Sequence, residues 1–110
     1  MRIRARVRNR QQLEVSYLRE SKLEIRLVSE VKRIGGRAPK WVSPGNRGVP
    51  DRLVILPGGR TVFVEMKAPG KPLEPLQARW AKILRNLGHQ VYKIDSNEDI
   101  DRFIAEVMPK

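Results

Sequence analysis

Apolar residues in the first third of the chain recur at spacings of three and four, the period of an amphipathic helix. They are Leu23, Leu27, Val28, Val31 and Ile34. Side chains at this spacing share one helical face, and glycine commonly follows the end of a helix. The pattern therefore predicts a helix over residues 15–34, ended by the glycine pair at 35–36.

Short apolar runs separated by turn residues replace this pattern in the middle of the chain. Residues 53–56 and 61–66 are rich in β-branched and aromatic side chains, and the tripeptide PGG lies between them at 57–59. This arrangement predicts a β-hairpin. Residues 40–42 predict a further short strand, and the composition of residues 43–48 is that of a loop.

Helical spacing returns in the last third of the chain, on either side of one more strand. Helical spacing over residues 75–87 predicts a helix that ends at Gly88, and the pattern of residues 90–94 predicts a strand. Ser96 can cap a final helix, with Asp99 placed to complete a capping box. The apolar positions of that helix are Ile100, Phe103, Ile104 and Val107.

The order of these elements, α-β-β-β-α-β-α, predicts an α/β fold with a mixed central sheet flanked by helices. The length of 110 residues suits one domain. We expect residues 15–110 to form that domain and residues 1–14 to form a basic N-terminal arm. No apolar run approaches the ~18 residues of a membrane span, so we expect none.

Charge indicates a partner for this domain. The chain carries 23 Lys and Arg against 12 Asp and Glu, a formal net charge of +11, and five of the arginines fall within the first ten residues. Such an excess on a small domain is typical of a protein that binds nucleic acid. An anionic membrane surface and simple solubility are the alternatives.

Cysteine is absent and there is a single histidine. This composition excludes a disulfide scaffold, a thiol nucleophile, and zinc sites built from cysteine or several histidines. Any catalysis must therefore use carboxylates, lysine, hydroxyls or amides.

Charged residues occur where the hairpin should be buried. Glu65 and Lys67 lie at the end of the strand over 61–66, where a charge costs desolvation energy unless it is paired or binds a ligand. If residues 57–59 form the turn, Asp51 lies opposite Glu65, with Lys67 on the same face. A two-residue turn would place Asp51 on the other face, and we expect the first register.

Two neighbouring carboxylates repel each other and favour a divalent cation between them. Oxygen ligands select Mg²⁺ or Mn²⁺, and a lysine beside the ion can hold a phosphate or orient water. Asp51, Glu65 and Lys67 together thus predict metal-assisted hydrolysis of a phosphodiester. The plainer interpretation is that these are surface charges at a turn and at a strand end.

The first predicted helix adds a further carboxylate. On a helical wheel Glu24 lies inside the apolar stripe, and Glu20 lies in line with it one turn earlier. An acid on such a stripe is usually a helix-end residue that reaches solvent. That explanation suits Glu20 better than Glu24, so Glu24 is the stronger functional candidate.

These motifs resemble the PD-(D/E)xK nuclease superfamily. Segment 48–51 reads GVPD and segment 65–67 reads EMK, on the second strand of a hairpin. The resemblance is closer to the VRR-NUC family, in the small stand-alone form found in phages, and covers about residues 20–105. The segments that match it in order and spacing include 40–45 (KWVSPG), 57–59 (PGG), 63–70 (FVEMKAPG) and 76–77 (LQ).

The resemblance implies an α-β-β-β-α-β core and an endonuclease that uses Mg²⁺ or Mn²⁺. It also implies that the protein acts as a homodimer on branched DNA, as a Holliday-junction resolvase does, in the cytoplasm of a bacterium or a phage-infected cell. By position, the implied catalytic and metal-binding groups are Asp51, Glu65, the main-chain carbonyl of Met66, Lys67, Gln77 and Glu24, with Glu20 a weaker choice than Glu24. We expect the Gln77 amide to contact Lys67 or a phosphate.

Polar and basic residues near these groups are candidates to contact DNA. Ser43, Asn46 and Arg47 either contact phosphate or only shape the loop before Asp51. The remaining candidates are Lys40 and Lys71. We expect Trp41 in the core, Trp80 in the core or a dimer interface, and His89 in solvent.

A non-catalytic nucleic-acid-binding protein is the alternative function. It explains the net charge but not the acid and the lysine on a buried strand. A lipid-binding protein is less favoured, since we expect no basic amphipathic helix with exposed apolar surface.

Overall fold

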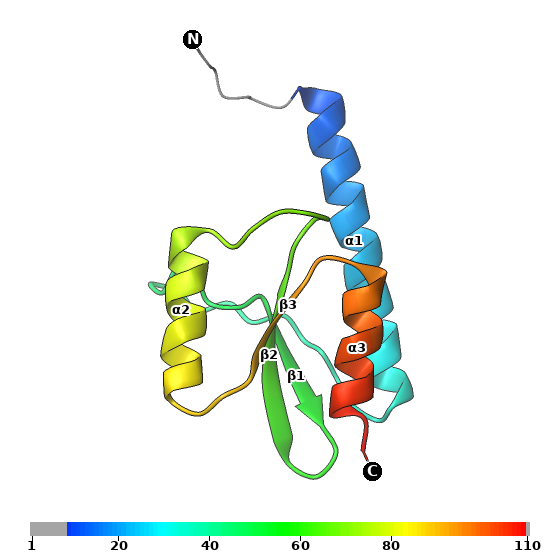
Figure 1. Cartoon of the computed structure of the whole chain (residues 1–110), viewed down its shortest axis with the longest axis vertical. Helices are drawn as coiled ribbons and strands as arrows, with labels where there is room; N and C mark the ends of the chain where they lie inside the picture. The colour runs from blue at the N-terminus through cyan, green and yellow to red at the C-terminus, as the bar shows by residue number, and fades with distance from the viewer. Residues whose placement is uncertain (1–8, 110) are drawn as a thin grey trace.

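The computed structural model describes residues 9–109, which form three helices and three strands (Figure 1). In chain order these are α1 (Arg10–Arg33), β1 (Arg52–Leu56), β2 (Arg60–Met66), α2 (Pro75–Asn86), β3 (Val91–Ile94) and α3 (Asn97–Val107). Within these residues, no helix is both long and apolar enough to cross a lipid bilayer.

The three strands form one mixed sheet in the order β1-β2-β3. β1 and β2 are antiparallel, and β3 is parallel to β2. Leu56 pairs with Arg60 across the turn at 57–59, and Arg52 pairs with Val64. The predicted hairpin register is therefore confirmed, and so is the predicted mixed sheet flanked by helices.

Helices cover both faces of the sheet (Figure 1). α1 and α3 lie side by side on one face, and α2 lies on the other. Side chains alternate between the faces along β2. Val62, Val64 and Met66 belong to the core cluster formed with α1 and α3, so Glu65 and Lys67 point to the face that carries α2.

α1 begins at Arg10, five residues before the predicted start, because Asn9 and Gln12 form a capping box. Residues 10–14, which we expected in the basic arm, are therefore helical. Four of the five arginines expected in that arm, at positions 2, 4, 6 and 8, lie outside the described residues. The first half of α1 projects beyond the rest of the molecule (Figure 1).

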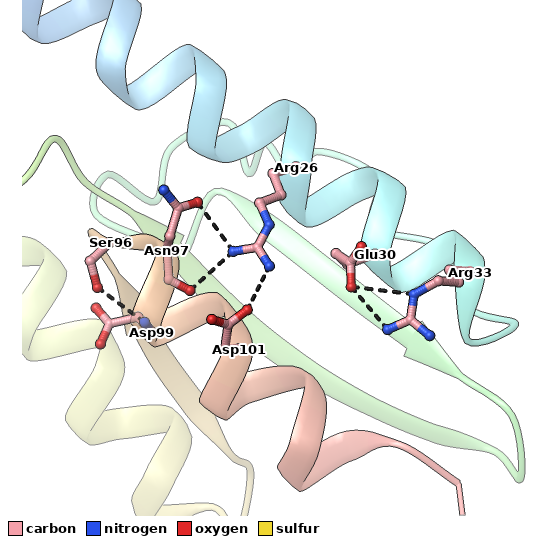
Figure 2. Close-up of polar contacts among 7 residues, drawn as sticks. All are labelled: Arg26, Glu30, Arg33, Ser96, Asn97, Asp99 and Asp101. Atoms are coloured by element: carbon pink, nitrogen blue, oxygen red, sulfur yellow. Dashed lines mark hydrogen bonds and ion pairs between the residues drawn. The ribbon is translucent and has the colours of Figure 1, made fainter.

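Arg26 of α1 holds α3 in place (Figure 2). Its guanidinium donates to the main-chain oxygen and to Oδ1 of Asn97, both at 3.1 Å, and forms an ion pair with Asp101.

Ser96 caps α3 as predicted, by accepting a hydrogen bond from the Asp99 backbone N–H. The reciprocal half of the capping box is absent, because the Asp99 carboxylate accepts from the Asp95 N–H instead.

The predicted strand at 40–42 is not a regular strand. Residues 37–41 run antiparallel to β1 and form two isolated bridges with it, Arg37 with Ile55 and Lys40 with Arg52, rather than a continuous ladder. Pro39 lies between these bridges and has no N–H to donate, so a continuous ladder cannot form.

Gly48 brings the loop at 43–48 against the start of α2. Its φ is +97°, and a Cβ at this position would lie 2.6 Å from the carbonyl carbon and oxygen of Leu76. A side chain cannot be accommodated at that separation, and the positive φ itself favours glycine. The loop can therefore pack directly on the α2 backbone.

Candidate active site

Asp51 and Glu65 meet at one end of the β1–β2 hairpin. The Met66 backbone N–H donates to Asp51 Oδ1 at 3.2 Å, which places the Asp51 carboxylate beside the last residues of β2. Glu65 is only 6% exposed, and Lys67 only 9%. The structure thus brings together the two carboxylates and the lysine of the predicted site.

Gln77 of α2 holds one oxygen of Glu65. Its side-chain N–H donates to Glu65 Oε2 at 2.7 Å, while its own Oε1 accepts from the Glu74 backbone N–H at 2.8 Å. We expected Gln77 to contact Lys67 or a phosphate. The Glu74 contact uses the Gln77 oxygen, so only the amide donors face the site, and they bond to a carboxylate rather than to an ammonium group.

The other oxygen of Glu65, Oε1, is buried and has no hydrogen-bond partner within residues 9–109. A buried acceptor without a partner costs about 1–3 kcal/mol, more when it is charged. A cation or a proton would remove that cost.

Both carboxyl groups resist ionisation. Burial and, after it, the charge of the neighbouring Asp51 raise the pKa of Glu65 to about 8, against the opposing charge of Lys67. Burial also raises the pKa of Asp51 to about 6, although the Met66 N–H favours the charged form. A pair with such raised pKa values is typical of a site that binds a cation or performs proton chemistry.

The donor atoms fit a hard divalent cation. Asp51 and Glu65 supply adjacent carboxylate oxygens, one of them without a partner in the described part of the chain. Mg²⁺ is commonly bound by one or two carboxylates while it keeps several waters. No group of three or more Asp, Glu, His or Cys side chains suited to a metal occurs in the described part of the chain. The protein would therefore supply two carboxylates, with the Met66 carbonyl as an additional candidate.

The two helix carboxylates lie in different surroundings. Glu24 accepts two hydrogen bonds from Arg52, at 2.8 and 3.2 Å. Burial raises the pKa of Glu20, and Glu24 raises it further, whereas Lys67 and the nearby Lys71 and Lys40 lower it. Among residues 9–109, Glu20 has no ion-pair or hydrogen-bond partner. It lies near enough to Lys67 for the charge of that lysine to lower its pKa.

The candidate DNA-contact residues fall into two groups. Ser43 and Asn46 bond to each other, since Asn46 donates from its side chain to Ser43 Oγ at 2.9 Å and from its backbone to the Ser43 carbonyl at 3.0 Å. This pair shapes the loop. Lys40, Arg47 and Lys71 are exposed and free to approach a polyanion.

Sequence reasoning missed the role of Arg52. The alternation of side chains along β1 gives a signal, because it puts Arg52 on the face opposite Asp51, towards α1 and its acids.

Trp41 is half-buried and packs on Phe63, with ring centroids 5.3 Å apart. His89 is exposed, as expected, and meets the same ring edge-on.

In the absence of divalent cations, we expect the free energy of unfolding to fall as the pH rises from about 4.5 to about 8. Over that range the folded protein keeps a proton on Glu65, whose pKa is about 8, while the unfolded chain, with a pKa near 4.5, has lost it. Because the folded state binds more protons, raising the pH favours unfolding.

Thermal melts in EDTA across this pH range measure the effect. The neutral variant Glu65→Gln should lose most of the slope, whereas Glu98→Gln, at an exposed position on α3, should keep it. Parallel pH profiles for the wild type and Glu65→Gln would contradict the raised pKa.

Comparisons with known proteins agree with this site and fold. The VRR-NUC domain family matches residues 2–98. The chain is 57% identical over 81 residues to "Putative nuclease p44" of Acyrthosiphon pisum secondary endosymbiont phage 1, an alignment that covers 74% of this chain and 87% of that protein. A solved VRR-NUC domain superimposes with a TM-score of 0.75 at 31% identity, covering 79% of this chain and 95% of the other. In sequence and in structure, the chain belongs to the VRR-NUC family of nuclease domains.

Proposed function

We propose that this nuclease is a DNA endonuclease that depends on Mg²⁺ or Mn²⁺ and cuts branched DNA. One observation carries the proposal. Asp51 and Glu65 lie side by side, one oxygen of Glu65 is buried with no hydrogen-bond partner among residues 9–109, and both carboxyl groups have raised pKa values. In a chain with a net charge of +11, a cation between these carboxylates would face a polyanionic substrate.

Each residue would contribute one task. Asp51, Glu65 and the Met66 carbonyl would hold the cation, which supplies the Lewis acidity that phosphodiester hydrolysis needs. Gln77 fixes one Glu65 oxygen and so would leave the other available to hold the cation.

Lys67 would hold the attacking water and offset charge that develops on the phosphate. Its backbone N–H donates to the Ile94 carbonyl of β3 at 2.9 Å, so β3 fixes the position of this lysine. Lys40, Arg47 and Lys71 would contact the DNA backbone, which positions the duplex without reading its sequence.

A non-catalytic DNA-binding protein remains the second candidate. It accounts for the positive charge but gives no reason to bury Glu65 Oε1 without a hydrogen-bond partner among the residues that the structure describes. Natural proteins rarely keep such an atom unless it has a catalytic or ligand-binding use.

Removal of either carboxylate should abolish cleavage. We expect Asp51→Asn and Glu65→Gln to lower the cleavage rate by about 100-fold or more, because each removes a charge that holds the cation. The measurement compares a labelled four-way junction with a linear duplex of the same sequence, in Mg²⁺, Mn²⁺ or EDTA. Glu98→Gln, an exposed acid on α3, is the matched control.

The pattern of products separates the claims. Metal-dependent cuts restricted to the junction support the full proposal, and equal cutting of both substrates removes the preference for branched DNA. Binding without cleavage under all of these conditions would instead favour the non-catalytic protein.

The two helix carboxylates should respond differently to substitution. We propose that Glu20 is the acid that assists at the site, because it lies within reach of the Lys67 charge and has no other partner in the described structure. Glu20→Gln should lower cleavage about tenfold with little change in melting temperature. Glu24→Gln should lower the melting temperature, because it leaves the largely buried Arg52 without its carboxylate partner, at a cost of about 1–3 kcal/mol.

Cleavage rates and thermal melts of the two variants test this assignment. A larger loss of cleavage in Glu24→Gln, at equal stability, would transfer the role to Glu24, the choice that the sequence favoured.

A homodimer would suit a branched substrate, because two sites related by a two-fold axis can cut two strands. α1 offers an apolar face for it. Tyr17 and Ile25 are 71% and 70% exposed, two turns apart on this helix, and Leu18 lies between them with 57% exposed. This surface on α1 shows that our expectation of no basic amphipathic helix with exposed apolar surface is wrong.

Substitution of this face should break the dimer. We expect Tyr17→Glu to shift the protein to monomer in sedimentation velocity, because burying a carboxylate between two copies costs more than the tyrosine contributes. Leu87→Glu, equally exposed at the end of α2, is the control and should sediment as the wild type does. A monomeric wild type would contradict the homodimer, and an unchanged Tyr17→Glu dimer would exclude this face.

A further inference from the structure

A cleft of about 310 Å³ lies between the loop at 45–47 and α2. Its walls include Arg47 from the loop and Leu76, Arg79, Trp80 and Ile83 from α2. The volume is at the lower end of the range of about 300–1,000 Å³ over which clefts bind small organic groups. The cleft has room for a compact planar group, not for a duplex.

The lining of the cleft combines an aromatic face with positive charge. Trp80 is half-buried and stacks on no other aromatic ring within residues 9–109. Arg47 and Arg79 are exposed and have no ion-pair partner in the same part of the chain, and no acidic side chain lines the cleft. An aromatic ring beside arginines is the combination that stacks a nucleobase and holds its phosphates.

The cleft shares its supports with the carboxylates. Leu76, which lines the cleft, precedes Gln77, which donates to Glu65. Gly48 packs on the Leu76 backbone and lies three residues before Asp51. One DNA strand could therefore pass from the cleft to the site along the start of α2.

We propose that this cleft binds one unpaired nucleotide of a DNA strand, with its base stacked on Trp80 and its flanking phosphates on Arg47 and Arg79. The inference rests on the proposed nuclease function and adds the structural feature that the enzyme recognises, an unpaired base near the scissile bond. Stacking of this kind tolerates any base, since every base has a π-face.

Tryptophan fluorescence tests the inference directly. The chain has two tryptophans, so Trp41→Phe leaves Trp80 as its one indole, and Glu65→Gln prevents cleavage. Titration with an oligothymidylate of about eight nucleotides should quench the Trp80 emission. A blunt hairpin duplex with the same number of nucleotides should leave the emission unchanged.

Affinity measurements on the Glu65→Gln protein complete the test. Fluorescence anisotropy with the labelled oligothymidylate should show about a tenfold loss for Trp80→Leu, and a comparable loss for Arg79→Ala. Lys82→Ala removes the same charge from an α2 position outside the cleft and should change affinity much less. Arg79→Ala keeps the test valid if Trp80→Leu fails to fold.

Two results would overturn the inference. One is unquenched Trp80 emission at saturating oligothymidylate. The other is an equal effect of Arg79→Ala and Lys82→Ala, which indicates general electrostatic attraction. Cleavage of the four-way junction and of the linear duplex by the wild type is measured separately, so a protein that quenches but cleaves neither would refute the nuclease proposal and leave the nucleotide site standing.

Discussion

The pairing of Leu56 with Arg60 decides where each charged group of the site lies. Side chains alternate along a strand, so a shift of one residue in the hairpin would turn Asp51 towards α1, away from Glu65. In the observed register Asp51 instead reaches the Met66 N–H, and the core residues of β2 still face α1 and α3. The three-residue turn thus sets both the burial of the core and the meeting of the carboxylates.

The same register makes the site costly to the metal-free protein. Glu65 is buried with one oxygen held by Gln77 and the other without a partner in the described structure. Neutral or charged, this side chain adds less to stability than an apolar residue of similar size would add there. The core between the sheet, α1 and α3 offsets the cost, since its members, such as Leu27, Val64 and Ile100, are fully buried.

The spacing of apolar residues was enough to predict the helices, and the turn residues were enough to predict the hairpin. Both signals depend only on a few neighbouring positions in the sequence. The hairpin prediction also placed Asp51, Glu65 and Lys67 together once the turn length was chosen. The partner of Glu24 was not predicted, since Arg52 lies 28 residues away and its choice depends on how α1 crosses the sheet. The contact of Gln77 with Glu65 likewise depends on the docking of α2, which no spacing in the sequence encodes. The strand predicted at 40–42 is wrong as a regular strand, because Pro39 interrupts the ladder between the extended segment 37–41 and β1.

That irregular segment protects the outer edge of the sheet. An unpaired edge strand offers its N–H and C=O groups to any other extended chain, which is a common route to aggregation. Here the N–H groups of Leu53 and Ile55 already donate to Pro39 and Arg37, at 3.0 and 2.8 Å, and the carbonyl of Asp51 accepts from Trp41. Segment 37–41 therefore closes the edge of β1 to further strands, although it is not itself a regular strand.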